Sequence, residues 1–93
     1  MSEKKCANVY RKLRNALEWA YDAGEAKEFE DSLRKLVESQ KLLKNLEEAC
    51  RIDVAKMSTK LEEAKEAARK ESHLGISWTI DEINDMLEKE LEK

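Results

Sequence analysis

The residues best suited to chemistry gather in one stretch, KESHLGISWTID, which runs from Lys70 to Asp81. It holds the only histidine of the chain, one of the two glycines and one of the two tryptophans. A histidine close to a serine and an aspartate could act as the base that activates a nucleophilic hydroxyl. His73, Ser77 and Asp81 are therefore the first catalytic candidates to weigh.

The same stretch also fits a turn between two helices, and we favour this interpretation. His73 would lie in the last turn of one helix, near its unpaired carbonyls, and Gly75 would end that helix in the left-handed conformation. Thr79 and Glu82 have the spacing of a capping box, which would start the next helix. Trp78, just before the cap, would then pack as part of a hydrophobic staple.

No other pattern indicates catalysis or a metal site. Cys6 and Cys50 have no neighbouring cysteine or histidine that would complete a set of metal ligands. Carboxylate pairs such as Glu62 and Glu66 occur without the Glu-x-x-His pairs typical of a di-metal bundle. We therefore expect no enzyme activity, no cofactor, no metal and no small-molecule substrate.

The two cysteines leave two interpretations open. In a helical protein such residues are most often small buried hydrophobic side chains. Cys6 and Cys50 could form a disulfide only if the first two helices pair with their midpoint near residue 28.

Composition predicts an all-α chain that forms a single domain over residues 1–93. Charged residues make up 42% of the sequence and aromatic residues only 5%, and there is no proline. This balance suits long solvated helices, because strands need more β-branched and aromatic residues. The formal net charge of −3 is too small to indicate a polyanionic partner such as nucleic acid.

No apolar run is long enough to span a bilayer, and the stretch MSEKKCANVY lacks the apolar core of a signal peptide. We therefore expect no membrane association and a cytoplasmic setting.

Apolar residues recur at steps of three and four, the spacing of a coiled-coil seam. This pattern predicts an antiparallel helical bundle, or coiled-coil hairpins, with three helices at about 3–23, 26–73 and 79–92. The first helix is expected to end at Gly24. The long central helix is expected because no glycine or proline interrupts the apolar series within it.

An alternative has four helices, with the long segment broken near Ser58 and Thr59. Thr59 and Glu62 have the spacing of a capping box, which would start a new helix there.

Two apolar surfaces exceed what a single neighbouring helix would cover. One is a stripe around Trp19 on the first helix, and the other is a belt from Leu42 to Ala55 that points in several directions. If the long helix is unbroken, self-association would be needed to bury the belt, whereas a break near Ser58 would let a monomer bury it. The candidates for contact with a partner are Ala16, Trp19, Ala23, Leu42, Leu46 and Ile52.

Charge is unevenly distributed between the first and last helices. The last helix is acidic from Asp81 to Glu92. Such runs are commonly solvated faces, but opposite charges can also attract, within one chain or across a dimer. The cations of the first helix are also the candidates for contact with an anion: Lys4, Lys5, Arg11, Lys12 and Arg14.

The segment AYDAGEAKEFEDSL, from Ala20 to Leu33, resembles the turn inside a tetratricopeptide-type helical hairpin. It lacks the Trp-x-x-Leu-Gly opening and the terminal proline of that family, and no repeat of the family's length follows. The resemblance therefore implies no function.

The leading hypothesis is a non-enzymatic helical protein–protein interaction module that self-associates through apolar helix faces. Its partner would be a protein or a second copy of the chain. The first alternative is an engineered or designed bundle with no native activity, because segments such as LEEAKEAARKE consist of strong helix formers. The second alternative is a weak anion or nucleic-acid binder that uses the basic first helix.

Overall fold

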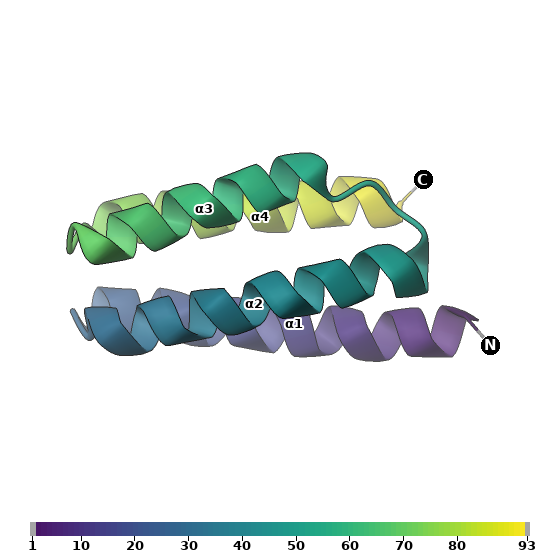
Figure 1. The fold of residues 1–93 in the computed structure, drawn as a ribbon, viewed down its shortest axis with the longest axis horizontal. Helices are drawn as coiled ribbons and strands as arrows, with labels where there is room; N and C mark the ends of the chain where they lie inside the picture. Colours follow the sequence, from purple (N-terminus) through teal and green to yellow (C-terminus); the bar gives the residue numbers. More distant parts are fainter. Residues whose placement is uncertain (1, 93) are drawn as a thin grey trace.

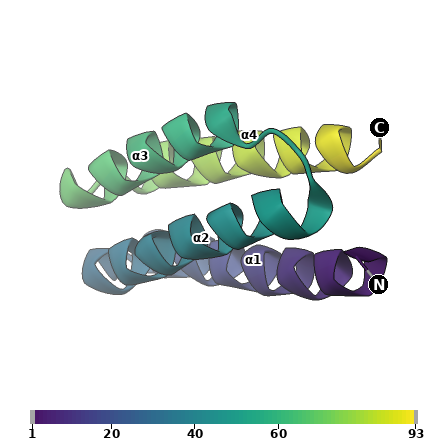
Figure 2. The same cartoon turned by 45° about the vertical axis from the view of Figure 1, so that its right-hand side comes forward.

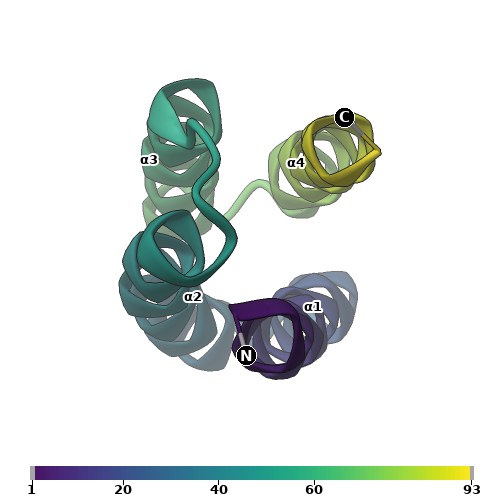
Figure 3. The same cartoon turned by 90° about the vertical axis from the view of Figure 1, so that its right-hand side faces the viewer.

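The computed structural model describes residues 2–92, which form four antiparallel helices and no strand. The helices are α1 (Ser2–Glu25), α2 (Phe29–Cys50), α3 (Ala55–Arg69) and α4 (His73–Leu91). The pair α1 and α2 forms one layer and the pair α3 and α4 the other, with both chain ends at the same end of the bundle (Figure 1). Seen along the bundle, the helices occupy the corners of a square in chain order (Figure 3).

The all-α class is as predicted, but the continuous helix over 26–73 is wrong. The chain leaves α2 at Arg51, which takes the left-handed conformation with φ of 56°, and its amide donates to the carbonyl of Glu47. The carboxylate of Asp53 then accepts a hydrogen bond from the amide of Ala55 at 3.0 Å. This side chain supplies a partner that the first turn of α3 lacks, so a new helix can begin. The connection crosses from one layer to the other beside the chain ends (Figure 2).

The alternative with four helices has the right number of helices. Its break near Ser58 and Thr59 is misplaced, because both residues lie inside α3. The Thr59 hydroxyl donates to the carbonyl of Ala55 one turn earlier, at 3.2 Å. A threonine inside a helix can bond in this way without capping anything. The capping-box spacing of Thr59 and Glu62 was therefore not a helix start.

The turn predicted around Gly75 is also wrong, since α4 begins at His73. Glu71 takes the left-handed conformation, with φ of 58°, and Ser72 caps α4 by accepting the Gly75 amide at 3.1 Å. Gly75 is needed for close approach instead: a Cβ there would lie 3.0 Å from the Cβ of Ala67 and from the Oγ of Ser72. Trp78 and Thr79 thus lie within α4, not before it.

At the end of α1, too, the left-handed residue is not the glycine that was predicted to end the helix. Gly24 remains helical, the helix runs on to Glu25, and Lys27 takes the left-handed conformation with φ of 62°. A Cβ at position 24 would lie 3.2 Å from two carbon atoms of Ile76 on α4. The glycine therefore lets α1 and α4 approach each other.

All four helices contribute to one closed core. Between α1 and α2 the contact is close because small residues face each other, and the buried Ser32 hydroxyl donates to the Ala20 carbonyl at 2.8 Å. Between α2 and α3, Gln40 donates to Glu62 at 2.7 Å and accepts a hydrogen bond from Lys65. The largest apolar side chains that are fully buried are Leu13, Leu17, Leu36, Leu43, Leu46, Met57, Leu61, Ile76, Ile80, Ile83 and Leu87.

A disulfide joins Cys6, near the start of α1, to Cys50, the last residue of α2. The Cα atoms of the two cysteines are 4.9 Å apart. Because α1 and α2 reverse direction at 26–28, the bond closes the open end of their hairpin. It lies at the end of α2 where the chain turns toward α3.

Opening the disulfide should destabilise the fold without changing it. The bond spans a sequence separation of 44 residues. The chain-entropy relation gives about 4 kcal/mol for a loop of that length. We expect reductant to lower the free energy of unfolding by up to that amount, measured by urea denaturation. The control is the Cys6→Ser, Cys50→Ser variant, whose stability should not respond to reductant. An equal response in both proteins would contradict the disulfide.

The position of the last turn can be tested at Glu71. A glycine avoids the steric cost of the left-handed conformation, so Glu71→Gly should raise the free energy of unfolding by about 1 kcal/mol. The matched control is Lys44→Gly in the exposed middle of α2, which should lower it by roughly 0.5–1 kcal/mol. A loss of stability in Glu71→Gly similar to that of the control would place residue 71 inside a helix and contradict the turn.

Candidate functional site

The structure gives Ser77 a structural task between α1 and α4. Ser77 is buried, and its hydroxyl lies 2.8 Å from Oε2 of Glu25 and 3.0 Å from the carbonyl oxygen of His73. It therefore joins the end of α1 to the start of α4. His73 is half-buried and Asp81 is exposed. The hydroxyl is bonded to a carboxylate and a backbone carbonyl rather than to the imidazole, so these residues do not form a Ser–His pair.

Large apolar side chains that stay outside the core mark the surface of interest. The exposed fractions are 63% for Trp19, 41% for Val37, 50% for Leu74 and 65% for Trp78. Scattered single apolar residues are normal on a protein surface, whereas neighbouring large ones indicate a contact surface. Leu74 and Trp78 meet the second description.

Leu74 and Trp78 stand one helical turn apart on the outer face of α4, and we call this pair the Trp78 patch. The patch rests on a rigid support. Ser72 caps the helix just before it, and the next residue along the chain on either side of Trp78 is buried. Sequence reasoning missed it because the helix was expected to begin only at 79. The spacing of four between the two residues was the signal that could have found it.

Trp19 lies on α1 at the side that faces α2. The Lys35 ammonium of α2 sits 4.5 Å from the centre of the indole ring, a cation–π contact. Lys35 also pairs with Glu38 at 3.2 Å. One face of the ring is therefore covered and the side chain is held in place, while most of its surface remains open to solvent.

The other partner candidates from the sequence lie mostly inside the chain's own core. Ala16, Ala23 and Leu46 are buried, and Leu42 and Ile52 are half-buried. Because the chain turns after Cys50, α3 and α4 pack over the belt that a continuous helix would have left bare. Of the six candidates, Trp19 alone is an exposed large side chain.

Carboxylates continue the outer face of α4 beyond the Trp78 patch. Asp81, Asp85, Glu88 and Glu92 are all exposed. Within the described part of the chain, no lysine or arginine pairs with any of them. This half of the helix surface is therefore mainly acidic, with Lys89 as the basic residue of its last turn.

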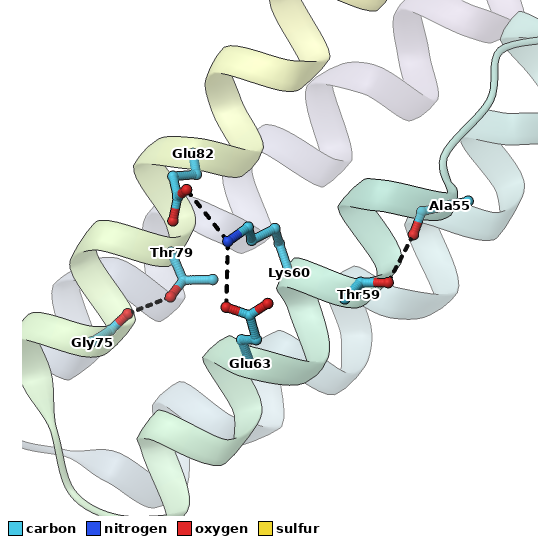
Figure 4. A network of polar contacts seen from close by, with 7 residues as sticks. All are labelled: Ala55, Thr59, Lys60, Glu63, Gly75, Thr79 and Glu82. Atoms are coloured by element: carbon cyan, nitrogen blue, oxygen red, sulfur yellow. Dashed lines mark hydrogen bonds and ion pairs between the residues drawn. The ribbon is translucent and has the colours of Figure 1, made fainter.

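Glu82 belongs to a different face, which packs on α3. Figure 4 shows Lys60 of α3 between two carboxylates, 3.4 Å from Glu63 and 3.4 Å from Glu82. Hydrogen bonds to Glu63 and Glu82 raise the pKa of Lys60 above its ordinary value of 10.5. In the same contact region the Thr79 hydroxyl donates to the Gly75 carbonyl at 2.6 Å.

Between α2 and α3, hydrogen bonds also shift the pKa of a carboxylate. Hydrogen bonds from Lys65 and Gln40 lower the pKa of Glu62 below its ordinary value of 4.5. These groups tie helices of one chain together.

The basic start of α1 is exposed except at one position. Lys4, Lys5, Arg11 and Lys12 lie on the surface. Arg14 is half-buried, donates to the Tyr10 hydroxyl at 2.6 Å and lies 5.6 Å from the centre of that ring. Arg14 is therefore engaged within α1 and is a poor candidate for an anion contact.

The surface of the bundle has several open hollows. Two of them lie at the end of the bundle that holds the disulfide, with volumes of about 400 Å³ beside Met57 and Met86 and about 470 Å³ beside Cys6 and Cys50. In residues 2–92, no group of three or more His, Cys, Asp and Glu side chains is placed to hold a metal ion.

None of the helices described in the structure is long and apolar enough to cross a membrane.

A smaller hollow lies between α1 and α4. It measures about 200 Å³ and is lined by Arg14, Glu18, Tyr21, Ile80 and Asn84. The side-chain oxygen of Asn84 is buried there without a hydrogen-bond partner. An ordered water could satisfy this oxygen, because the hollow is polar and has room for one.

Comparisons with protein-family models, with curated protein sequences and with solved structures yield no match to this chain.

Proposed function

We propose that the chain is a non-enzymatic helical protein–protein interaction module that self-associates through exposed apolar side chains. The observation that carries the proposal is the Trp78 patch: Leu74 and Trp78 are 50% and 65% exposed although the core closes without them. Neither side chain is needed to fill the bundle. Their exposure is explained if a second molecule covers them.

The physical properties of the patch support a contact role. Burying a leucine side chain contributes about 1.5–3 kcal/mol, and tryptophan is among the residues that most often dominate binding energy. The pair lies on a helix rather than a loop, so little conformational freedom is lost when it binds. Trp19 offers a second anchor of the same kind, already held by Lys35.

The remaining functions considered for the sequence have less support. A catalytic role would need a base and a nucleophile in contact, whereas the Ser77 hydroxyl bonds to Glu25 and a backbone carbonyl. An anion site on α1 would lose Arg14, which is bonded to Tyr10. The cytoplasmic setting stays a prediction, and a structural disulfide is more typical of oxidising compartments.

An engineered or designed scaffold is the second candidate. It is favoured by the short turns between the helices and by a disulfide that closes the first hairpin like an added staple. Under this proposal the exposed tryptophans would be neutral surface residues.

Self-association should be visible in solution and should depend on the Trp78 patch. We expect sedimentation equilibrium to show an average mass above that of one chain at concentrations between about 1 µM and 1 mM, the range of weak specific contacts. The Leu74→Ser, Trp78→Ala variant should raise the dissociation constant at least about tenfold, equivalent to about 1.4 kcal/mol. Its unfolding midpoint in urea should stay close to that of the wild type, because both side chains are exposed.

Val37→Ala serves as the control, since Val37 is the large exposed apolar residue that lies apart from both tryptophans in sequence. It should associate as the wild type does. A wild-type protein that remains a monomer throughout this range would contradict the proposal and favour the scaffold.

A further inference from the structure

The outer face of α4 carries a row of exposed residues that is apolar at one end and acidic at the other. Its residues recur at steps of four and three, which keeps them on one side of the helix. The end near the start of α4 is apolar and the remainder is acidic. All members of this row, the α4 stripe, are exposed: Leu74, Trp78, Asp81, Asp85, Glu88 and Glu92.

An exposed face of α1, on the side toward α2, carries a seam with the complementary polarity. Its steps are again three and four, but the basic residues lie near the start of the helix and the tryptophan near its end. Within residues 4–92, neither Lys5 nor Lys12 has a carboxylate partner. All members of this seam, the α1 stripe, are exposed: Lys5, Asn8, Lys12, Asn15, Trp19 and Asp22.

The two stripes match in one antiparallel register. Lys5, Lys12 and Trp19 stand seven residues apart, and so do Trp78, Asp85 and Glu92. When the helices run in opposite directions with Trp19 opposite Trp78, Lys12 falls opposite Asp85 and Lys5 opposite Glu92. Seven residues are two turns of a helix in a coiled coil, so the three pairs can form together.

We propose, building on the self-association proposed above, that the α1 stripe of one copy binds the α4 stripe of the next copy in this register. Charge complementarity selects a second copy as the occupant. Pairing two α4 stripes would leave their acidic halves without cations. Pairing two α1 stripes would offer Lys5 and Lys12 of both copies no carboxylate except Asp22. The tryptophans supply the affinity, and the charge pairs set direction and register.

The stripes of a single copy cannot meet each other. α1 and α4 already contact each other through other faces, with Gly24 against Ile76 and Glu25 bonded to Ser77. Trp19 lies on the side of α1 that faces α2, where Lys35 covers one face of its ring, while Trp78 points outward from the α3–α4 layer. Each copy therefore presents both stripes at once, and the contact is heterologous. Such contacts extend beyond a dimer unless they close into a ring.

The test uses two single variants, Trp19→Ala and Trp78→Ala, measured by sedimentation alone and as a one-to-one mixture. Each removes one anchor from one stripe and leaves the other stripe intact. We expect each variant alone to be largely monomeric. The mixture should form a dimer of one copy of each and stop there, because the intact α4 stripe of Trp19→Ala meets the intact α1 stripe of Trp78→Ala. The wild type should grow past a dimer as concentration rises.

A charge exchange tests the register independently of the tryptophans. Lys12→Glu should weaken self-association about tenfold at low salt, because the introduced carboxylate would then face Asp85 of the next copy. Adding Asp85→Lys to the same chain should restore it, since the pair is re-formed with its charges exchanged. Circular dichroism should show the same helix content in all variants, because the substituted side chains are exposed.

Three results would overturn the inference. If Trp19→Ala alone associates as strongly as the wild type, the contact does not use the α1 stripe, although self-association as such would stand. If the mixture of single variants does not pair, or the second charge change does not restore association, the register is wrong. A wild type that stays monomeric up to about 1 mM would overturn both this inference and the proposed function.

Discussion

The turn between Cys50 and Ala55 decides how much apolar surface one chain can cover by itself. A continuous helix would carry the belt from Leu42 to Ala55 away from the other helices. The turn instead folds α3 back along α2, so that Leu43, Leu46 and Val54 end in the core. The left-handed Arg51 and the Asp53 carboxylate make this reversal possible. The disulfide fixes the end of α2 to the start of α1 at the same end of the bundle.

Because the core is closed, the large apolar residues that remain exposed are candidates for contact with another molecule. In an unbroken helix the belt would have been exposed because no other helix of the chain covers it. In the four-helix bundle, Trp19 and Trp78 are exposed although Ala20, Ser77 and Thr79, the residues next to them in the chain, are buried. The self-association that we propose therefore uses the exposed faces of α1 and α4 and not the belt. The acidic and basic ends noted in the sequence also become parts of defined stripes on these faces.

The all-α class could be predicted because the three-to-four spacing of apolar residues extends over the whole chain and does not depend on where each helix begins or ends. A turn after the first helix was also predicted, between 23 and 26, and the structure has it at 26–28. The start of the first helix and the end of the last were predicted within one residue of the observed Ser2 and Leu91. The inner helix boundaries were misplaced, because glycines and capping-box spacings were taken as the signals. The left-handed conformation is taken by Lys27, Arg51 and Glu71. The two glycines lie instead where a side chain of another residue approaches the backbone closely. Packing of this kind depends on a distant helix and is not visible in local sequence.

The candidate site was predictable only in part, for the same reason. Trp19 was identified, because its position off the main seam follows from helical spacing alone. Leu74 and Trp78 were missed because the helix start was placed too late. Ser72 as a cap, followed by an apolar residue at 74, was the available signal.

The central claim is that one chain folds back after Cys50 and closes its own core. Small-angle X-ray scattering tests it most directly, at low concentration and high salt, where association through charged stripes is weakest. The four-helix bundle has a Cα radius of gyration of 12.5 Å and extends over 40 Å along its longest axis. We expect a scattering profile of those dimensions, enlarged by side chains and hydration. A rod of about 70 Å, the length of an unbroken helix over 26–73, would contradict the fold and the surfaces derived from it.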